Sequence, residues 1–510
     1  MGVLSACPPR SCIPLEETIR RALDELPETL DETYARTLEE IGKKKWKYAQ
    51  LIFQCIAAAS RPLLVSELAE FLAFDFEAGS TPTLLADRRL EDPAHTVLSV
   101  CSSLLVIVEP GSGSPVVQFA HFSVKEYLMS VQLAGAKDTI SRYHISMSAA
   151  HTIVARACLG VLLHLDDNVT KDSLEKFPLA EYAAEHWVEH ARFEDVSLTV
   201  QDGMKRLFDP SNSYLSIWVW LCDPKDITNQ SERSERPGKA SATPLHYAAL
   251  CGICDVVKFL ILERSQDVNA RGFDTKETPL LVASRHGHAD VARLLLEHGA
   301  DADARYGDND SNPTPLLLAT ENGYVEVARI LLEYHADTEA RAILGWSPLT
   351  VASLFVQVEI ARALLEHGAD VNSKDTSNKT PLYYAHREVV ARLLIEYGAD
   401  VNAVDIDGRT PLHLASERGN PGAAWAILEH GADPNARDAS NATPLHLTSY
   451  TKYVANGEAG PLIVHLLIHF GSDIHARDDE GRTPFMRATE QGFDGLIQVL
   501  LEYGAEDHRR

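Results

Sequence analysis

The stretch that decides the fold is T-P-L-H-L-A-S-E-R-G-N, residues 410–420, because its pattern recurs through the second half of the sequence. A Thr-Pro or Ser-Pro pair occurs at spacings of 35, 36, 33, 33, 30, 33 and 40 residues. These pairs begin at Thr243, Thr278, Thr314, Ser347, Thr380, Thr410, Thr443 and Thr483. An acidic residue follows each pair, at Asp267, Asp301, Asp337, Asp370, Asp400, Asp433, Asp473 and Glu506. The commonest intervals, 23 residues and then 10, add to a period of 33.

The chemistry of one period predicts two helices and a hairpin. Thr410 can cap a helix, and Pro411 occupies the first helical position, where a missing N–H costs nothing. Gly419 then breaks the chain before a second helix, which in the best copy, residues 291–297, has an apolar stripe of period 3.6. D-I-D-G, residues 405–408, has the composition of a polar turn. Eight such copies over residues 241–510 resemble ankyrin repeats, which implies an α-solenoid.

The histidine of this phrase, at His246, His413 and His446, invites a catalytic interpretation. The resemblance implies a different role, a hydrogen bond in the turn that ties repeats together. Two repeats depart in length: repeat 5 lacks three residues around His386, and repeat 7 gains seven between residues 453 and 461. We expect a shortened helix or turn in repeat 5 and a longer loop in repeat 7. The connector after repeat 2, residues 305–313, is longer by three.

Repeat 4 is apolar where its neighbours are polar. Its incoming hairpin reads A-I-L-G-W, residues 342–346, and its inter-helix turn reads L-F-V-Q, residues 354–357. Apolar residues at a hairpin tip are candidates for anchoring a protein partner in the concave groove. The predicted partner-binding residues are Ile343, Leu344, Trp346, Leu354, Phe355, Phe273 and Tyr306. The alternative is that the apolar side chains of repeat 4 only cover the irregular junction with repeat 5.

The first half predicts helices followed by one β-hairpin. Helical patterns occupy residues 15–26, the segment after Pro27, residues 47–59 and residues 67–73, and the β-rich runs 103–109 and 116–122 flank a turn. This order is that of a winged helix, and a further helix is expected over residues 177–191. The expected organisation is a tail (1–14), a helical and winged-helix domain (15–140), a helical domain (141–222), a polar linker (223–240) and the repeat array (241–510). The fold class is therefore mostly α.

Five phrases in this half match a known fungal family: residues 22–38, 60–73, 101–107, 119–128 and 178–187. Over residues 18–220 the sequence resembles the region after the nucleotide-binding domain of fungal NACHT-type proteins, relatives of NOD-like receptors. The family's NTPase carries a phosphate loop, G-x-x-x-x-G-K-[ST], and no such motif occurs here. The sequence begins where that NTPase would have ended. A shortened homologue and an incomplete gene model both remain open.

Charge narrows the classes of partner. The formal net charge is −26, with −12 in residues 1–235 (22 basic, 34 acidic) and −14 in residues 236–510 (25 basic, 39 acidic). Such a surface argues against nucleic acid and anionic membranes, both of which require a cationic face. The eight cysteines form no paired framework, and no apolar run is long enough for a secretory signal or a membrane span. We expect a cytoplasmic protein; K-K-K-W-K, residues 43–47, makes nuclear entry the alternative.

Catalytic motifs are weak throughout. H-W-V-E-H, residues 186–190, has the spacing of an inverted zinc-protease motif, but no third ligand follows and an ordinary amphipathic helix explains it. Cys251 and Cys254 have no second ligand pair, so we expect packing cysteines. We therefore expect a non-enzymatic adaptor or sensor that binds a protein on the concave face of the array, without a cofactor, metal or small-molecule substrate. The alternatives are a fragment of an ATP-dependent NACHT switch and a winged-helix DNA-binding regulator.

Overall fold

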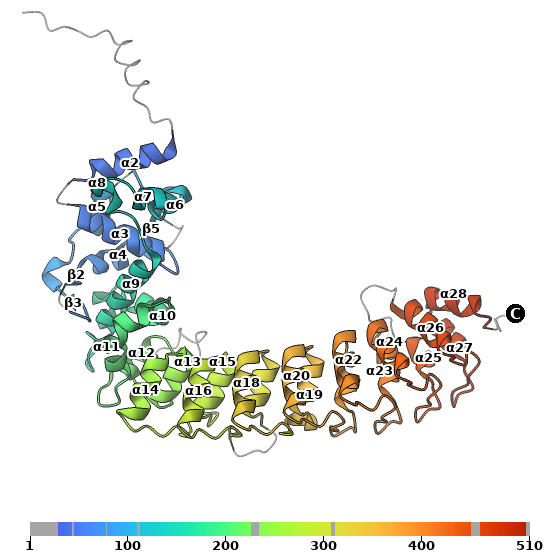
Figure 1. The fold of residues 1–510 in the computed structure, drawn as a ribbon. Helices are drawn as coiled ribbons and strands as arrows, with labels where there is room; N and C mark the ends of the chain where they lie inside the picture. Colours follow the sequence, from blue (N-terminus) through green and yellow to red (C-terminus); the bar gives the residue numbers. More distant parts are fainter. Residues whose placement is uncertain are drawn as a thin grey trace, which may run out of the picture. The chain divides into compact units, whose positions relative to one another are not determined.

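A computed structural model describes residues 29–42, 45–77, 79–101, 103–109, 113–225, 234–307, 312–449 and 459–505. The chain divides into two compact units, residues 1–239 and 240–510 (Figure 1). The helix expected over residues 15–26 and the tail 1–14 lie outside the described residues. The division of the first unit near residue 140 remains a prediction.

The first unit is built mainly of helices. Their bounds are α2 (Leu30–Glu40), α3 (Trp46–Ala58), α4 (Val65–Leu72), η1 (Ala86–Arg88), α5 (Pro93–Cys101), α6 (Phe122–Leu128), α7 (Val131–Ala134), α8 (Asp138–Ser141), α9 (Met147–Leu162), η2 (Asp172–Lys176), α10 (Ala180–Ala191), α11 (Val196–Phe208) and α12 (Tyr214–Leu221). The helices expected after Pro27 and over residues 47–59, 67–73 and 177–191 correspond to α2, α3, α4 and α10. Most of their ends shift by one to three residues, which is the usual uncertainty at helix termini.

A small antiparallel sheet completes the winged helix. β4 (Leu105–Val108) pairs with β5 (Val116–Phe119), as the two β-rich runs predict, and β1 (Leu63–Leu64) adds on the other side of β5. The strand order is β1-β5-β4. A separate pair joins β2 (Phe74–Asp75) to β3 (Thr83–Leu84). The arrangement of α3, α4 and α5 followed by the hairpin confirms the winged helix.

The helix α9 is the centre of the remaining helices of this unit, since α3, α10 and α11 all pack against it. Three large aromatic side chains close the core beside it. The Trp187 and Trp218 rings meet edge to face with centroids 5.3 Å apart, and Phe208 packs against both. All three are essentially buried, so this core supplies much of the apolar area that α10, α11 and α12 remove from water.

The second unit is a row of eight helix pairs within the described residues (Figure 1). The pairs are α13 (Pro244–Cys251) with α14 (Cys254–Leu262), α15 (Pro279–His286) with α16 (Ala289–Glu297), α17 (Pro315–Glu321) with α18 (Val325–Glu333), α19 (Pro348–Leu354) with α20 (Val358–Glu366), α21 (Pro381–Tyr384) with α22 (Glu388–Glu396), α23 (Pro411–Glu417) with α24 (Pro421–Glu429), α25 (Pro444–Leu447) with α26 (Ala459–His469), and α27 (Pro484–Gln491) with α28 (Asp494–Glu502). First helices stack on first helices, and second helices on second helices. Every first helix begins with the proline of a Thr-Pro or Ser-Pro pair, as the repeat predicts.

The histidines of the repeat phrase link neighbouring repeats. His413 Nδ1 accepts the N–H of Thr410 at 3.0 Å, so Nε2 carries the proton and donates to the Ala442 carbonyl of the next repeat at 3.1 Å. His246 and His446 make the same link to the carbonyls of Glu277 and Arg482. These contacts confirm the structural role and give buried histidines a reason to be present.

Repeat 5 achieves the same link with a different side chain. Its first helix, α21, is only four residues long, which confirms the shortening expected around His386. Tyr383 occupies the histidine position, and its hydroxyl lies 2.5 Å from the Arg409 carbonyl, the equivalent acceptor. Residues 450–458, in which most of the insertion of repeat 7 falls, lie outside the described residues.

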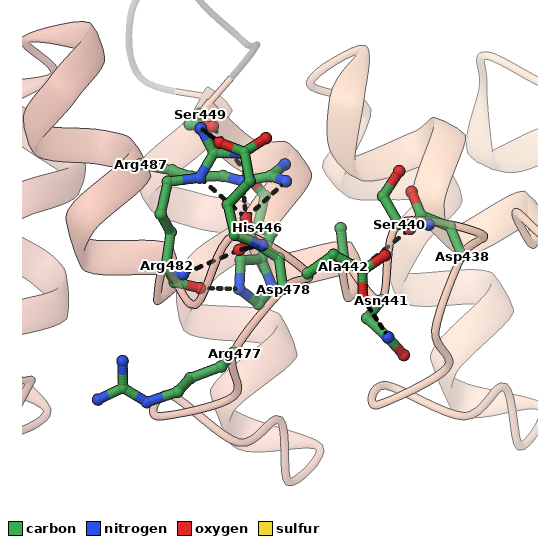
Figure 2. A network of polar contacts seen from close by, with 12 residues as sticks. Asp438, Ser440, Asn441, Ala442, His446, Ser449, Arg477, Asp478, Arg482 and Arg487 are labelled. Carbon is green, nitrogen blue, oxygen red and sulfur yellow. Dashed lines mark hydrogen bonds and ion pairs between the residues drawn. The ribbon is translucent and has the colours of Figure 1, made fainter.

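The hairpins are held by an aspartate that recurs in the later repeats. Asp478 Oδ1 accepts the N–H groups of Glu480 and Arg482, while Oδ2 meets the guanidinium groups of Arg482 and Arg487 (Figure 2). Burial alone would raise the pKa of Asp478, but the Arg482 N–H and the two guanidinium groups outweigh it, so this pKa lies below its ordinary value. Figure 2 also shows His446 directed at the Arg482 carbonyl, so both links meet at one junction.

A second ladder runs along the ends of the second helices. Asn372 donates from Nδ2 to the Gly398 carbonyl and accepts the Asp400 N–H at Oδ1, and the pattern recurs at other junctions. At two junctions a carboxylate replaces the amide: Asp303 accepts from the Asp337 N–H, and Glu339 accepts from the Asp370 N–H. A carboxylate cannot make the donor half of this contact. The ladder is therefore incomplete where repeats 2, 3 and 4 meet.

Candidate functional site: an apolar cavity at repeats 3 and 4

A cavity of about 350 Å³ lies between the hairpins and the first helices of repeats 3 and 4. Its walls come from the hairpin that enters repeat 4 and from α17 and α19. The lining residues are Tyr306, Pro313, Leu317, Glu321, Ala342, Ile343, Leu344, Trp346, Val351 and Phe355. All but one of them are apolar or aromatic, and the volume is in the range of sites that take a large side chain or a small ligand.

The hairpin of repeat 4 is fixed by backbone contacts. The Ala342 N–H donates to the Trp346 carbonyl at 3.0 Å, and the Gly345 N–H returns to the Ala342 carbonyl at 2.9 Å. The Leu344 carbonyl accepts both the N–H and the hydroxyl of Thr376, at 3.1 and 2.9 Å. Because Thr376 belongs to the next hairpin, repeat 5 holds the tip of repeat 4 in place.

Two residues of repeat 4 adopt backbone conformations that disfavour branched side chains. Leu344 has a φ of +70° beside Gly345 at the hairpin tip. Val356 has a φ of +61° in the inter-helix turn of repeat 4. Other repeats have a glycine at this position, for example Gly252 and Gly287. Left-handed conformations of this kind cost about 1–2 kcal/mol for a residue with a Cβ. Repeat 4 thus retains two strained apolar residues close to its cavity, a distribution that is typical of functional sites.

Aromatic side chains form two sides of the cavity. The Arg285 guanidinium lies over the Tyr306 ring, 5.7 Å from its centroid. The Trp346 ring meets Tyr384 edge to face, with centroids 5.6 Å apart. Burial, with the hydrogen bond to Asp375, raises the pKa of Tyr384 to about 12, so its hydroxyl stays protonated and donates to Asp375. Both walls are therefore supported by polar contacts behind them.

The rim of the cavity is exposed, and its described residues carry a single charge. Ile343 is 66% exposed, Leu344 57% and Phe355 48%, so three large apolar side chains border one opening. Glu321 is the only ionisable acid or base among the lining residues besides the phenol of Tyr306. Within the described residues its carboxylate has no hydrogen-bond or ion-pair partner. An apolar group with a neighbouring cation would complement this surface.

The structure brings together five of the seven residues singled out from the sequence. Tyr306, Ile343, Leu344, Trp346 and Phe355 all line the cavity. The other two lie elsewhere. Leu354 packs with Trp346 against the buried cluster that includes Tyr383 and Tyr384. Phe273 is 8% exposed and meets the Tyr247 ring edge to face at 5.3 Å, so it belongs to the core of repeats 1 and 2.

Sequence reasoning missed half of the lining: Pro313, Leu317, Glu321, Ala342 and Val351. Leu317 and Val351 appear in the sequence as ordinary core positions of first helices, and the structure buries them. Glu321 reads as a polar helix end. An alignment of the repeats contains a usable signal, because residues at the end of one first helix face the hairpin of the next repeat.

The histidines of the H-W-V-E-H segment, residues 186–190, contact neighbouring side chains of the first unit. His190 is buried between His151, whose Nδ1 lies 2.8 Å from its Nδ1, and the Tyr182 hydroxyl, 2.9 Å from its Nε2. Burial, with the neighbouring histidines, lowers the pKa of His190 to about 3, so it stays neutral. His186 instead lies beside Glu185 and Glu189. The parts of the chain that the structure describes contain no cluster of three or more His, Cys, Asp or Glu able to hold a metal.

The two cysteines of the C-x-x-C pair flank the turn that ends α13. Cys251 is buried and Cys254 partly buried on either side of Gly252, whose φ of +69° ends α13. Among the described residues, no helix is both long enough and apolar enough to cross a bilayer.

Comparisons with protein families agree with the two-unit description. A model for ankyrin repeats matches residues 212–306, 245–342, 303–375, 337–405 and 374–438. A model described as the winged helix domain of GPI inositol-deacylase matches residues 34–137. These matches correspond to the helix pairs α13–α24 and to the segment from α2 to α7.

Three curated proteins illustrate the range of relatives. The azaphilone pigments biosynthesis cluster protein L of Monascus ruber is 29% identical over 294 residues, which are 55% of this chain and 61% of that protein. The vegetative incompatibility protein HET-E-1 of Podospora anserina is 24% identical over 191 residues, 33% of this chain and 13% of that protein. The human palmitoyltransferase ZDHHC13 is 38% identical over 77 residues, 15% of this chain and 12% of that protein.

The chain thus spans less than two thirds of each of these proteins, and the shortest of the three matches is 77 residues long. The eight helix pairs, the histidine links and the family matches describe one architecture. This chain is a mostly helical ankyrin-repeat protein with an N-terminal winged-helix domain, and it is related at low identity to a fungal vegetative incompatibility protein.

Proposed function

We propose that the chain is a non-enzymatic adaptor or sensor whose ankyrin array binds a protein partner at the cavity of repeats 3 and 4. Ankyrin arrays present an extended surface for protein interaction, which supports the coarse role. The observation that carries the finer proposal is the exposed apolar rim of Leu344 and Phe355 around a 350 Å³ cavity, with backbone strain at Leu344. Exposed apolar patches and retained backbone strain both favour an interaction site.

The partner has a defined chemistry in this proposal. One large apolar side chain enters the cavity between Tyr306 and Trp346, and a lysine or arginine beside it pairs with Glu321. The net charge of −14 over residues 236–510 favours the approach of a basic segment. Since most binding energy at an interface comes from a few buried anchors, one such side chain can dominate the affinity.

The test pans a displayed library of random 12-residue peptides against the full chain and measures the affinity of the selected peptides. The expected consensus is one aromatic or long aliphatic residue adjacent to a lysine or arginine. Phe355→Ala should weaken binding about tenfold or more, as loss of a contact at an interface hot spot does. Ile406→Ala is the matched control, because Ile406 is also an exposed apolar residue, in the hairpin of repeat 6.

Leu344→Gly separates binding from stability. Glycine relieves the left-handed strain at this position, so the free energy of unfolding should stay the same or rise by up to about 1 kcal/mol. Binding should nevertheless weaken, because a rim side chain is gone. Selected peptides that bind Leu344→Gly, Phe355→Ala and wild-type chains equally would refute the site, and a consensus without an apolar residue would refute the proposed chemistry.

The biological setting is a second level of the proposal. Similarity to a vegetative incompatibility protein over 191 residues, and the resemblance to the segment that follows the NTPase in fungal NACHT-type proteins, support a role in non-self recognition. The competing candidate is part of an ATP-dependent switch. Measuring ATP and ADP binding by the purified chain distinguishes the two, since micromolar nucleotide binding would overturn the adaptor proposal. Deletion in the native host should alter incompatibility between strains if the recognition role is correct.

A further inference from the structure

We propose that the winged-helix unit contains a second, independent site that binds a small amphipathic anion, a carboxylate or phosphate attached to an apolar group. The site is a cavity of about 320 Å³ bounded by α3, α4, η1 and α5. Its lining residues are Lys45, Tyr48, Leu72, Arg88, Leu90, Thr96, Ser99 and Val100. This inference does not depend on the proposed function of the ankyrin array.

The cavity has an apolar floor. Leu72 on α4 is 5% exposed and Val100 on α5 is 8% exposed, and the partly buried Leu90 joins them. Because Leu72 and Val100 are already packed in the core, they line the cavity with fixed apolar atoms and need not move when an apolar group enters. The volume accommodates a chain of several methylenes or an aromatic ring, whose transfer from water is favourable.

Two cations and a phenol lie at the same cavity. Lys45 Nζ donates to the Ser99 carbonyl at 2.9 Å and to the Ser99 hydroxyl at 3.5 Å, which leaves one further N–H group on an ammonium that carries three. Within the described residues the Arg88 guanidinium has no side-chain partner, and neither has the Tyr48 hydroxyl. An anion held by Lys45 and Arg88 would make charge-assisted hydrogen bonds, which are the stronger class.

The neighbouring residues sharpen the choice of ligand. Among the described residues that line the cavity there is no carboxylate, although the chain has a net charge of −26. Arg89, next to Arg88, instead pairs with the buried Glu70 at 2.7 Å and lies over the Phe177 ring. The Ser99 hydroxyl donates to a backbone carbonyl, so it does not compete for the anion. Among the described lining residues, Arg88 is thus the cation without a side-chain partner.

The experiment titrates the full chain with decanoate, decanol and inorganic phosphate in a calorimeter. Decanoate should bind with one equivalent and a Kd of about 0.1 mM, in the range expected for a ligand of this size. Decanol, which lacks the charge, and phosphate, which lacks the chain, should each bind at least about tenfold more weakly, because each loses one of the two contributions. Decyl phosphate should bind like decanoate.

Substitutions locate the site. Arg88→Ala should weaken decanoate binding about tenfold, and Arg88→Lys should recover most of it, since a cation is restored at an exposed position. Leu90→Asp should abolish binding by placing a carboxylate in the cavity. Leu198→Ala, at an exposed apolar residue of α11 that does not line the cavity, is the control and should leave the Kd unchanged.

Three results would overturn the proposal. Equal binding of decanoate and decanol would show that Lys45 and Arg88 make no contribution. A Kd that Arg88→Ala leaves unchanged would place the ligand elsewhere. Retention on vesicles of phosphatidylcholine with phosphatidate, without binding of free decanoate, would identify a lipid surface rather than a small anion as the partner.

Discussion

Replacing His413 with leucine tests the histidine link between repeats, because repeats 2 and 3 already carry leucine at this position as Leu281 and Leu317. His413 is fully buried and holds two backbone groups: it accepts the Thr410 N–H and donates to the Ala442 carbonyl. Leucine makes neither contact but keeps a comparable volume. An unsatisfied buried carbonyl costs about 1–3 kcal/mol, so His413→Leu should lower the free energy of opening of repeats 6 and 7 by about 2 kcal/mol at pH 7.

The effect should depend on pH with a defined sign. Burial lowers the pKa of His413 below its ordinary value of 6.5, with the bond to Ala442 only partly opposing this. The unfolded chain then binds more protons than the folded chain as pH falls through 6.5, so wild-type stability is fully present above that pH and is lost below it. The loss is at most about 1.4 kcal/mol per pH unit for one group.

Hydrogen exchange of peptides from α23 and α25, measured at pH 7.5 and pH 5.5 and corrected for intrinsic rates, reports this local opening. His246 and His446 are present in both proteins, so their titration cancels in the difference. The penalty of His413→Leu should shrink from about 2 to about 1 kcal/mol between the two pH values. A penalty that is independent of pH, or that grows at pH 5.5, would refute a neutral, linking histidine.

Three further substitutions or reactions follow from individual contacts. Asp303→Asn should raise the urea midpoint of the array by an increment that corresponds to about 1 kcal/mol in the free energy of unfolding. The amide can donate as well as accept, and burial already raises the pKa of the Asp303 carboxyl above its ordinary value. A lower midpoint would contradict this. His335→Gly should raise the thermal midpoint by about 2 °C or more, since His335 has a φ of +61° where other repeats have glycine; no change would show that the strain is negligible. Cys55 should resist iodoacetamide at pH 8 in the native chain, because complete burial raises the pKa of its thiol, while the partly exposed Cys254 reacts first; equal rates would refute the burial argument.

The repeated Thr-Pro pairs were enough to predict eight helix pairs, because each pair carries its own start signal and the period repeats it. A three-residue deletion was enough to predict the short α21. Local signals fail where pairing is distant. β1 consists of two residues, Leu63 and Leu64, and it exists only because Val116 and Val117 lie beside it in space.

At the candidate site, too, residues with a local sequence signal could be predicted, and residues placed by distant contacts could not. The unusual apolar composition of A-I-L-G-W indicated Ile343, Leu344 and Trp346, since a composition that departs from its neighbours is visible in sequence. Phe273 has the same appearance, but contact with the Tyr247 ring buries it, and that contact depends on tertiary packing. Glu321 was missed because its place at the rim follows from stacking one repeat on the next.

The cross-repeat links are unevenly distributed. His246, Tyr383, His413 and His446 join repeats 1–2, 5–6, 6–7 and 7–8. At the three intervening junctions the corresponding residues are Leu281 and Leu317, which have no polar group, and Thr350, whose hydroxyl meets Ser347 of its own repeat. In a nearest-neighbour description of a solenoid, this buried link therefore adds no coupling at the centre of the array, where the apolar cavity lies, and the repeats there are joined by apolar packing and by hairpin hydrogen bonds. A ligand spanning repeats 3 and 4 would add coupling at junctions that lack the buried link, so occupancy there would raise the cooperativity with which the array unfolds.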